Sequence, residues 1–180
     1  MDQGPLPPPE FSRIADTRRI DAAPYRLEAN EAERAALAKR FGLVAIHRLE
    51  AELELEMDGS AVDATGRLEA DIVQSCAVSG EDLATAIRET LRFRFVPQAE
   101  LEHSGAEEEI ELEEGELDEV PFTGTALDLG EAIAQSLALA VDPFATGPGA
   151  EQARKEAGLM DEGAAGPFAA LAALKDAKKT

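Results

Sequence analysis

Three runs of alternating apolar and polar residues limit what this chain can fold into. The first run, residues 49–57, reads L-E-A-E-L-E-L-E-M and sets four glutamates against an apolar face. Residues 62–73 and 87–96 alternate in the same way, and turn residues separate the runs at 58–60 and 79–82. A period of two is typical of strands with one wet face, so the sequence predicts a three-stranded antiparallel meander. The residues expected to face inward in the first run are Leu49, Ala51, Leu53, Leu55 and Met57.

Two helices are predicted, one on each side of this meander in the sequence. Asn30 and Glu33 have the spacing of a capping box, which predicts a helix over residues 31–41 that stops at Gly42. The second helix is expected to begin within residues 126–131, with Asp128 as its N-cap. Its predicted packing face is Leu129, Ile133, Leu137 and Ala140, joined by Ala132, Ser136 and Leu139. The fold class is therefore α+β: a mainly antiparallel β-sheet with two packed helices, an acidic loop and flexible termini.

The remaining segments give the expected domain organisation. Residues 1–10 are rich in proline and are predicted to be a disordered lead. Residues 11–145 are predicted to form a single domain, in which 11–20 is an edge strand or an extended arm and 25–29 is a short strand. The tail, residues 146–180, is expected to be flexible apart from a short C-terminal helix at about residues 167–175.

The formal net charge of −20 is concentrated in one segment of the 180-residue chain. Residues 100–119 contain eleven acidic side chains and no Lys or Arg. Such a charge disfavours autonomous binding to nucleic acid and favours a basic protein partner. Its leucines and isoleucine alternate with acids, which is compatible with pairing of part of the segment as an edge strand. The candidate partner-binding residues here are Glu107, Glu108, Glu109, Glu111, Glu113 and Glu114.

The wet face of the predicted sheet is also charged, with glutamates on the first strand and arginines on the third. Cross-strand pairing of opposite charges explains such a face without any ligand. The alternative is a docking surface for a charged partner. Its candidate residues on the third strand are Arg88, Arg92 and Arg94.

Recognised catalytic, cofactor and metal motifs are absent from the sequence. Cys76 is the only cysteine, which excludes an internal disulfide and fits a reducing cytoplasm. Zinc needs about four ligands, and one cysteine with two scattered histidines does not supply them. Since the first residues do not show a basic stretch followed by an apolar one and no apolar run is long enough for a membrane span, we expect neither secretion nor membrane insertion. We therefore expect a cytoplasmic protein that is not an enzyme and holds no cofactor.

The turn around Cys76 carries a family resemblance. Residues 74–81, Q-S-C-A-V-S-G-E, follow G-R-L-E-A-D-I-V and precede a strand of the form Ile-x-x-x-Leu-x-Phe-x-Phe. This pattern resembles the YceD family in its alphaproteobacterial form. The family-motif turn comprises Gln74, Cys76, Ser79 and Gly80. The start at 10–13, the helix region 127–143, the tail 166–175 and the acidic insertion are also similar to the family.

The resemblance implies a ribosome biogenesis factor that supports accumulation of large-subunit ribosomal RNA. The implied partner is a large-subunit precursor or a basic ribosomal protein, with direct rRNA contact disfavoured by the net charge. Many family members carry Cys-x-x-Cys at this turn, whereas Ser79 stands at the second position here. Two alternatives stay open: a thiol-based sensor or enzyme using Cys76, and a structural oligomer built through a sheet edge.

Overall fold

The computed structural model describes residues 9–100 and 118–158, which fall into two compact units. Unit 1 comprises residues 1–74 and 84–142, and unit 2 comprises residues 75–83 and 143–180. Three predicted segments lie wholly or mostly outside the described residues. They are the disordered lead at 1–10, of which only residues 9 and 10 are described, most of the acidic loop at 100–119, and the expected helix at 167–175. The expectation of a single domain over 11–145 therefore stays a prediction.

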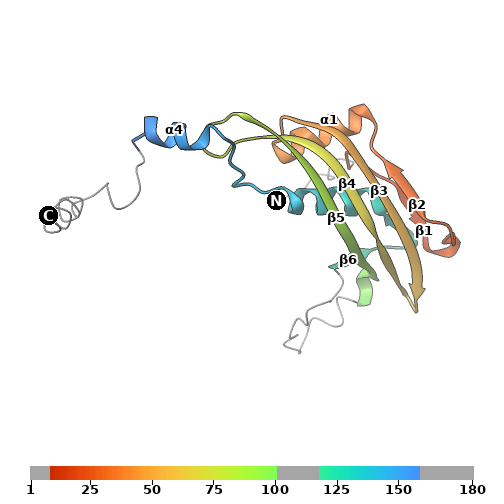
Figure 1. Cartoon of the computed structure of the whole chain (residues 1–180). Helices are drawn as coiled ribbons and strands as arrows, with labels where there is room; N and C mark the ends of the chain where they lie inside the picture. The colour runs from red at the N-terminus through yellow and green to blue at the C-terminus, as the bar shows by residue number, and fades with distance from the viewer. Residues whose placement is uncertain (1–8, 101–117, 159–180) are drawn as a thin grey trace, which may run out of the picture. The chain divides into compact units, whose positions relative to one another are not determined.

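A five-stranded sheet and a two-stranded sheet make up the β-structure of the described residues, and helical elements lie between and after the strands (Figure 1). The strand order in the larger sheet is β2-β3-β4-β5-β6, and β1 pairs with β7 in the smaller one. The elements are β1 (Ile14–Asp16), the 3-10 helix η1 (Thr17–Arg19), β2 (Tyr25–Glu28), α1 (Glu31–Phe41), β3 (Ala45–Asp58), β4 (Ala61–Ser75), β5 (Asp82–Pro97), β6 (Asp118–Phe122), β7 (Ala126–Asp128), α3 (Leu129–Ala140) and α4 (Ala150–Glu156).

The predicted α+β class with a mainly antiparallel sheet is confirmed, and the three alternating runs are the consecutive neighbours β3, β4 and β5. The sheet is more complex than a meander. β2 joins β3 in antiparallel orientation, with Leu27 opposite Ala51. β6 joins β5 in parallel orientation, with Phe95 opposite Val120, so the sheet is mixed.

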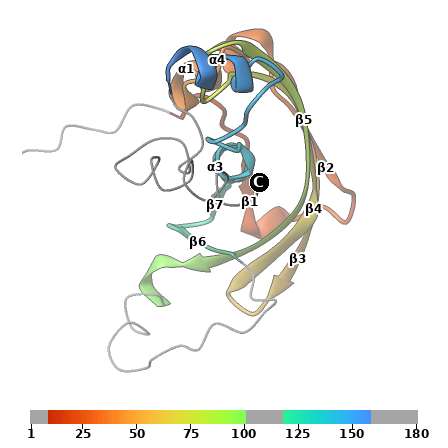
Figure 2. The ribbon, with the colours of Figure 1, turned by 60° about the vertical axis from the view of Figure 1, so that its left-hand side comes forward.

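The core of unit 1 lies on one face of this sheet, which curves around α3 (Figure 2). The buried sheet residues Leu53, Leu68 and Phe95 each have 1% or less of their surface exposed. From α3, Ile133 and Leu137 are fully buried, as the predicted packing face requires. The alternation seen in the sequence therefore corresponds to one face against the helices and one face against water.

Local capping sequences set the ends of the two predicted helices. Asn30 accepts a hydrogen bond from the backbone of Glu33, whose carboxylate accepts one from the backbone of Asn30, so the predicted capping box is confirmed. Asp128 caps α3 by accepting from the backbone N–H of Glu131. The residues just before this cap form β7 rather than the first helical turn, because they pair with β1.

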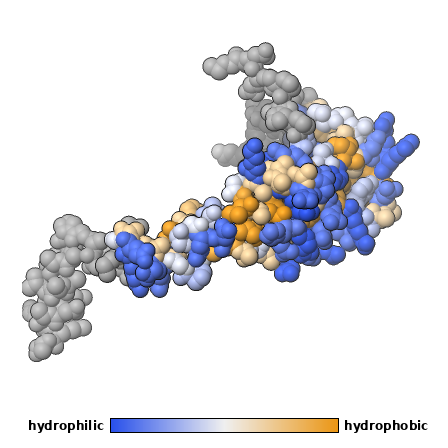
Figure 3. Space-filling view, turned by 90° about the horizontal axis from the view of Figure 1, so that it is seen from above, coloured by the Kyte–Doolittle hydropathy of each residue, from blue (hydrophilic) through white to orange (hydrophobic). Residues whose placement is uncertain are grey.

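Two apolar residues predicted to face inward are exposed. Met57 is 47% exposed, because it lies close to the β3–β4 turn and beyond the part of β3 that β2 joins. Leu139 is 84% exposed, because it lies two positions from buried Leu137, on the opposite side of a helix with 3.6 residues per turn. Apolar residues also appear among hydrophilic ones on the surface that Figure 3 shows.

Unit 2 joins the turn between β4 and β5 to the segment that contains α4. Ala77 donates a backbone hydrogen bond to the carbonyl of Ala145 at 2.9 Å. The backbone N–H of Gly149, just before α4, donates to the Glu81 carboxylate at 2.8 Å. The helix α4 was not predicted from the sequence, where the Gly-Pro-Gly at 147–149 indicated a flexible tail.

Candidate functional site

The solvent-exposed face of the large sheet is the first candidate site. Its acidic and basic side chains are carried by different strands, so the strand order determines where each charge lies. The glutamates of β3, Glu50 to Glu56 at alternate positions, lie on one side of β4 and the arginines of β5 on the other. The register determines which charges meet. Glu52 lies opposite Arg67, whereas Glu50 lies opposite Glu69 and Glu56 opposite Asp63. Like charges directly opposite one another destabilise a sheet unless a cation lies between them.

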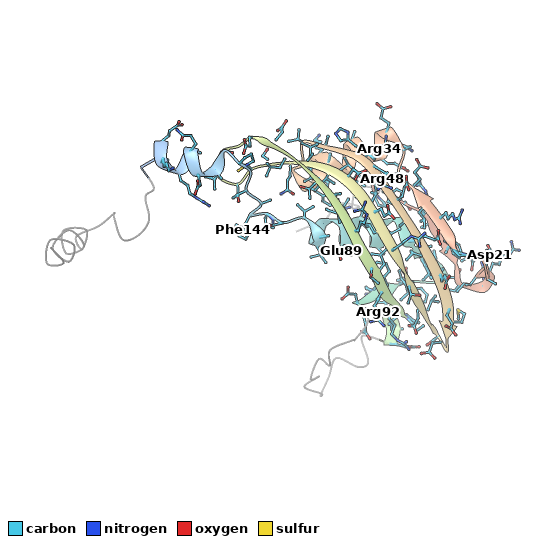
Figure 4. The ribbon with its side chains drawn as sticks, in the orientation of Figure 1. Asp21, Arg34, Arg48, Glu89, Arg92 and Phe144 are labelled. Carbon is cyan, nitrogen blue, oxygen red and sulfur yellow. The ribbon has the colours of Figure 1, made fainter. Side chains whose placement is uncertain are left out.

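Arg48 supplies that cation at one end of the face (Figure 4). Its Nε lies 2.9 Å from the carboxylate of Asp71, and its Nη1 lies 3.1 Å from Glu69 and 3.5 Å from Glu50. These hydrogen bonds, with Asp71 first and Glu69 second, raise the pKa of Arg48 above its ordinary value. The repulsion between Glu50 and Glu69 is thus relieved within the protein.

Arg94 performs the same role at the other end. Its guanidinium contacts Asp58 at 2.6 Å and Asp63 at 2.7 Å. The hydrogen bond to Asp58 is the main cause that raises the pKa of Arg94. Of the three predicted arginines, Arg94 is therefore engaged by intramolecular carboxylates.

Arg88 and Arg92 differ from Arg94. Both are exposed on β5, and neither has an ion pair or side-chain hydrogen bond with any residue that the structure describes. Figure 4 marks Arg92 on this strand. Local sequence patterns could not separate these arginines from Arg94, because the difference depends on Asp58 and Asp63, which lie 36 and 31 positions from Arg94. The six candidate glutamates at 107–114 lie outside the described residues.

An acidic hollow of about 240 Å³ lies at the end of the wet face near the β3–β4 turn. Asp21, Glu54, Glu56 and Asp63 line it, and only Asp63 has an ion pair, to Arg94, among the described residues. Sequence reasoning missed Asp21, because it belongs to the loop before β2 and carries no local pattern. The hollow offers carboxylates to a cationic group.

The second candidate site is the family-motif turn, most of which belongs to unit 2. The Cys76 side chain is only 3% exposed, and its Sγ accepts hydrogen bonds from the backbone N–H groups of Val78 (3.5 Å), Ser79 (3.3 Å) and Gly147 (3.4 Å). A bond from the Ser79 side chain, followed by these backbone bonds, lowers the pKa of Cys76 to about 6. Hydrogen bonds to the charged form favour the thiolate over the thiol.

The structure brings together three of the four residues of the predicted turn. Gly80 closes it by donating its backbone N–H to the carbonyl of Cys76 at 3.0 Å. Gln74, the fourth, belongs to unit 1, where it is buried and donates to the carbonyl of Asp142 at 2.9 Å. Its Oε1 is buried without a hydrogen-bond partner among the described residues.

Residues 9–100 and 118–158 contain neither a candidate metal site nor a candidate membrane-spanning helix. No group of three or more His, Cys, Asp or Glu side chains in these ranges has an arrangement that could hold a metal ion. None of the helices in the same ranges has both the length and the apolar character that crossing a bilayer requires.

The fold and the site define an acidic α+β protein with a curved, mainly antiparallel sheet, one charged face and a cysteine-containing turn. The family model described as large ribosomal RNA subunit accumulation protein YceD matches residues 64–175, more than half of the chain. The chain therefore belongs to the YceD family. Comparison with curated proteins and with solved structures gives no match.

Proposed function

We propose that this protein supports the accumulation of large-subunit ribosomal RNA as a cytoplasmic, non-catalytic binding protein. The observation that carries the proposal is the match of residues 64–175 to a family named for that role. The match includes most of β4 and all of β5, the Cys76 turn and α3.

The partner that the surface suits best is a basic ribosomal protein within a large-subunit precursor. The net charge of −20 attracts basic proteins and opposes contact with RNA phosphates. The acidic hollow at Glu54 and Glu56 supports the same partner, because these carboxylates have no ion pair among the described residues. The acidic segment at 107–114 would add a second contact.

The role in rRNA accumulation is tested by depleting the protein from its native cells and measuring the ratio of large-subunit to small-subunit rRNA. We expect the ratio to fall and the wild-type gene to restore it. An unchanged ratio would reject the role. Restoration by a Cys76→Ser variant separates binding from thiol chemistry, since a sensor or enzyme that uses the thiol would lose its function.

The binding mode is tested by capture of tagged protein from native lysate at low and moderate salt, with sucrose-gradient separation. Large-subunit precursors or a basic ribosomal protein should be retained at low salt. Replacing the six glutamates at 107–114 with Gln should weaken retention and flatten its salt dependence. Failure of wild-type protein to retain any ribosomal component at low salt would contradict stable binding.

A further inference from the structure

One edge of the large sheet is open over most of the length of β5. β6 pairs with β5 only from Phe93 to Pro97, whereas β5 begins at Asp82. Over residues 82–92, no strand lies on that side of β5 within the described part of the chain. Alternate residues of an antiparallel strand direct both N–H and C=O away from the paired neighbour, so the segment presents a row of backbone donors and acceptors.

A groove of about 240 Å³ runs beside this open edge, between β5 and α3. Glu89, Leu91 and Arg92 of β5 and Asp118 of β6 line one wall, and Ser136 and Leu139 of α3 line the other. Leu139 is 84% exposed, so its apolar side chain is open to a bound segment. The groove thus combines an unpaired strand edge with an exposed apolar side chain.

The charges in the groove are acidic on the side that faces α3. Glu89 shares the face of Leu91 and Phe93 by strand alternation, and Asp118 lies opposite Phe93 in the parallel register (Figure 4 marks Glu89). Neither carboxylate has an ion pair with a described residue. A strand added here would place every second side chain between these carboxylates and Leu139.

We propose that the open edge of β5 is a docking site for an extended segment of a basic protein, which adds a strand to the sheet. Lys or Arg at alternate positions fits the groove, because the aliphatic stem covers Leu139 while the charged end reaches Glu89 or Asp118. The intervening residues would be uncharged, because Arg88 and Arg92 alternate with Glu89 along β5 and Arg92 also borders the groove. The inference rests on the proposed function, for which it names the contact surface.

The binding experiment uses the full chain and an octapeptide of alternating lysine and threonine, with a glutamate–threonine octapeptide as control. Backbone amide exchange is measured residue by residue by NMR. We expect alternate amides of 83–92 to exchange rapidly in the free protein and about tenfold more slowly at saturating lysine peptide. The absence of added protection at these amides would overturn the proposal.

Two results on the protein alone would also overturn it. Protection of the open-edge amides in dilute free protein would mean that the chain itself covers the edge. Protection that grows with protein concentration would mean that a second copy covers it. Either occupant would replace the basic segment proposed here.

Matched variants separate the groove from general attraction by an acidic protein. The double variant Glu89→Gln/Asp118→Asn should weaken peptide binding about threefold to tenfold, and Leu139→Ser should weaken it further. The control Glu28→Gln/Glu31→Gln removes the same charge at two exposed positions outside the groove and the acidic hollow, and should leave binding to the groove nearly unchanged. Equal loss in both double variants would reject the groove.

Repeating the lysate capture with the groove double variant distinguishes the two proposals. Loss of ribosomal components by the variant, but not by wild type, supports both. Retention by both proteins overturns the groove and leaves the proposed function standing. Retention by neither, together with peptide protection of the open edge, rejects the ribosomal role and supports the groove as a binding site.

Discussion

The Sγ atom of Cys76 accepts a hydrogen bond from the backbone N–H of Gly147, 3.4 Å away and 71 positions further along the chain. Since the backbone N–H groups of Ser79 and Val78 also donate to it, the sulfur links the β4–β5 turn to the segment before α4. The cysteine therefore has a structural role within unit 2 that requires no second cysteine.

The first prediction concerns the pKa of Cys76. The Ser79 side chain is the largest cause that lowers this pKa to about 6, so Ser79→Ala should raise the pKa toward the ordinary thiol value of about 8.5. Titration of the thiolate absorbance in the ultraviolet measures it. Ser75→Ala, at the exposed last residue of β4, is the matched control and should leave the pKa near 6. A wild-type pKa at the ordinary value would contradict the prediction.

The same pKa predicts how stability depends on pH. A folded-state pKa below the unfolded value contributes stability that is fully present above about pH 8.5 and is lost as pH falls through about 6. The difference in free energy of unfolding between wild type and Cys76→Ser should therefore increase as pH rises through this window. Denaturant titrations at several pH values measure the difference, and a flat profile would argue against a stabilised thiolate.

Two glycines should respond differently to alanine. A Cβ at Gly66 would overlap the backbone carbonyl of Glu52 in the paired strand β3, and a strand backbone cannot move away cheaply. We expect Gly66→Ala to destabilise the protein by roughly 1–3 kcal/mol, as overpacking does. At Gly147 the overlap is with the side-chain ends of Glu81 and Leu83, which can rotate, so Gly147→Ala should cost less. Thermal unfolding compares them, with exposed Thr65→Ala as control; a larger loss at Gly147 would contradict this order.

Helix caps provide a third comparison of stability. Asn30→Ala removes the capping box of α1 and should cost about 1 kcal/mol. Asp128→Ala should cost more, because Asp128 caps α3 and also accepts from the Ser12 hydroxyl at 2.6 Å and the Arg13 backbone at 3.0 Å. Denaturant midpoints measure both losses. Equal losses would mean that the contacts with residues 12 and 13 contribute little.

Local patterns predicted most of the elements, because a cap or an alternating strand depends on residues a few positions apart. Asn30 and Glu33 fixed the start of α1, and the alternation in 49–96 identified β3, β4 and β5. The parallel pairing of β6 with β5 could not be predicted in the same way, since Asp118 lies 25 positions beyond Phe93 and no local pattern joins them. The helix α4 was missed because its attachment to Glu81 is a long-range contact.

The candidate site was predicted less completely than the fold. The sequence identified a charged sheet face and its arginines, but not which of them are engaged. Arg94 reaches Asp58 and Asp63 only because the β3–β4 turn brings these carboxylates beside β5. The open β5 edge could not be predicted from the sequence either, because the length of the edge depends on where β6 begins to pair. The groove beside it depends on the exposed position of Leu139.

The last prediction separates the three arginines of β5 by function and by stability. Arg94→Ala removes the cation between Asp58 and Asp63 and should lower the melting temperature, with a smaller effect at high salt. Arg88→Ala and Arg92→Ala should leave the melting temperature nearly unchanged, because neither side chain has an ion pair among the described residues. If either arginine contacts a partner, its loss should weaken capture of ribosomal components from lysate without destabilising the protein. Capture that falls only with Arg94→Ala, in parallel with stability, would remove Arg88 and Arg92 from the binding surface.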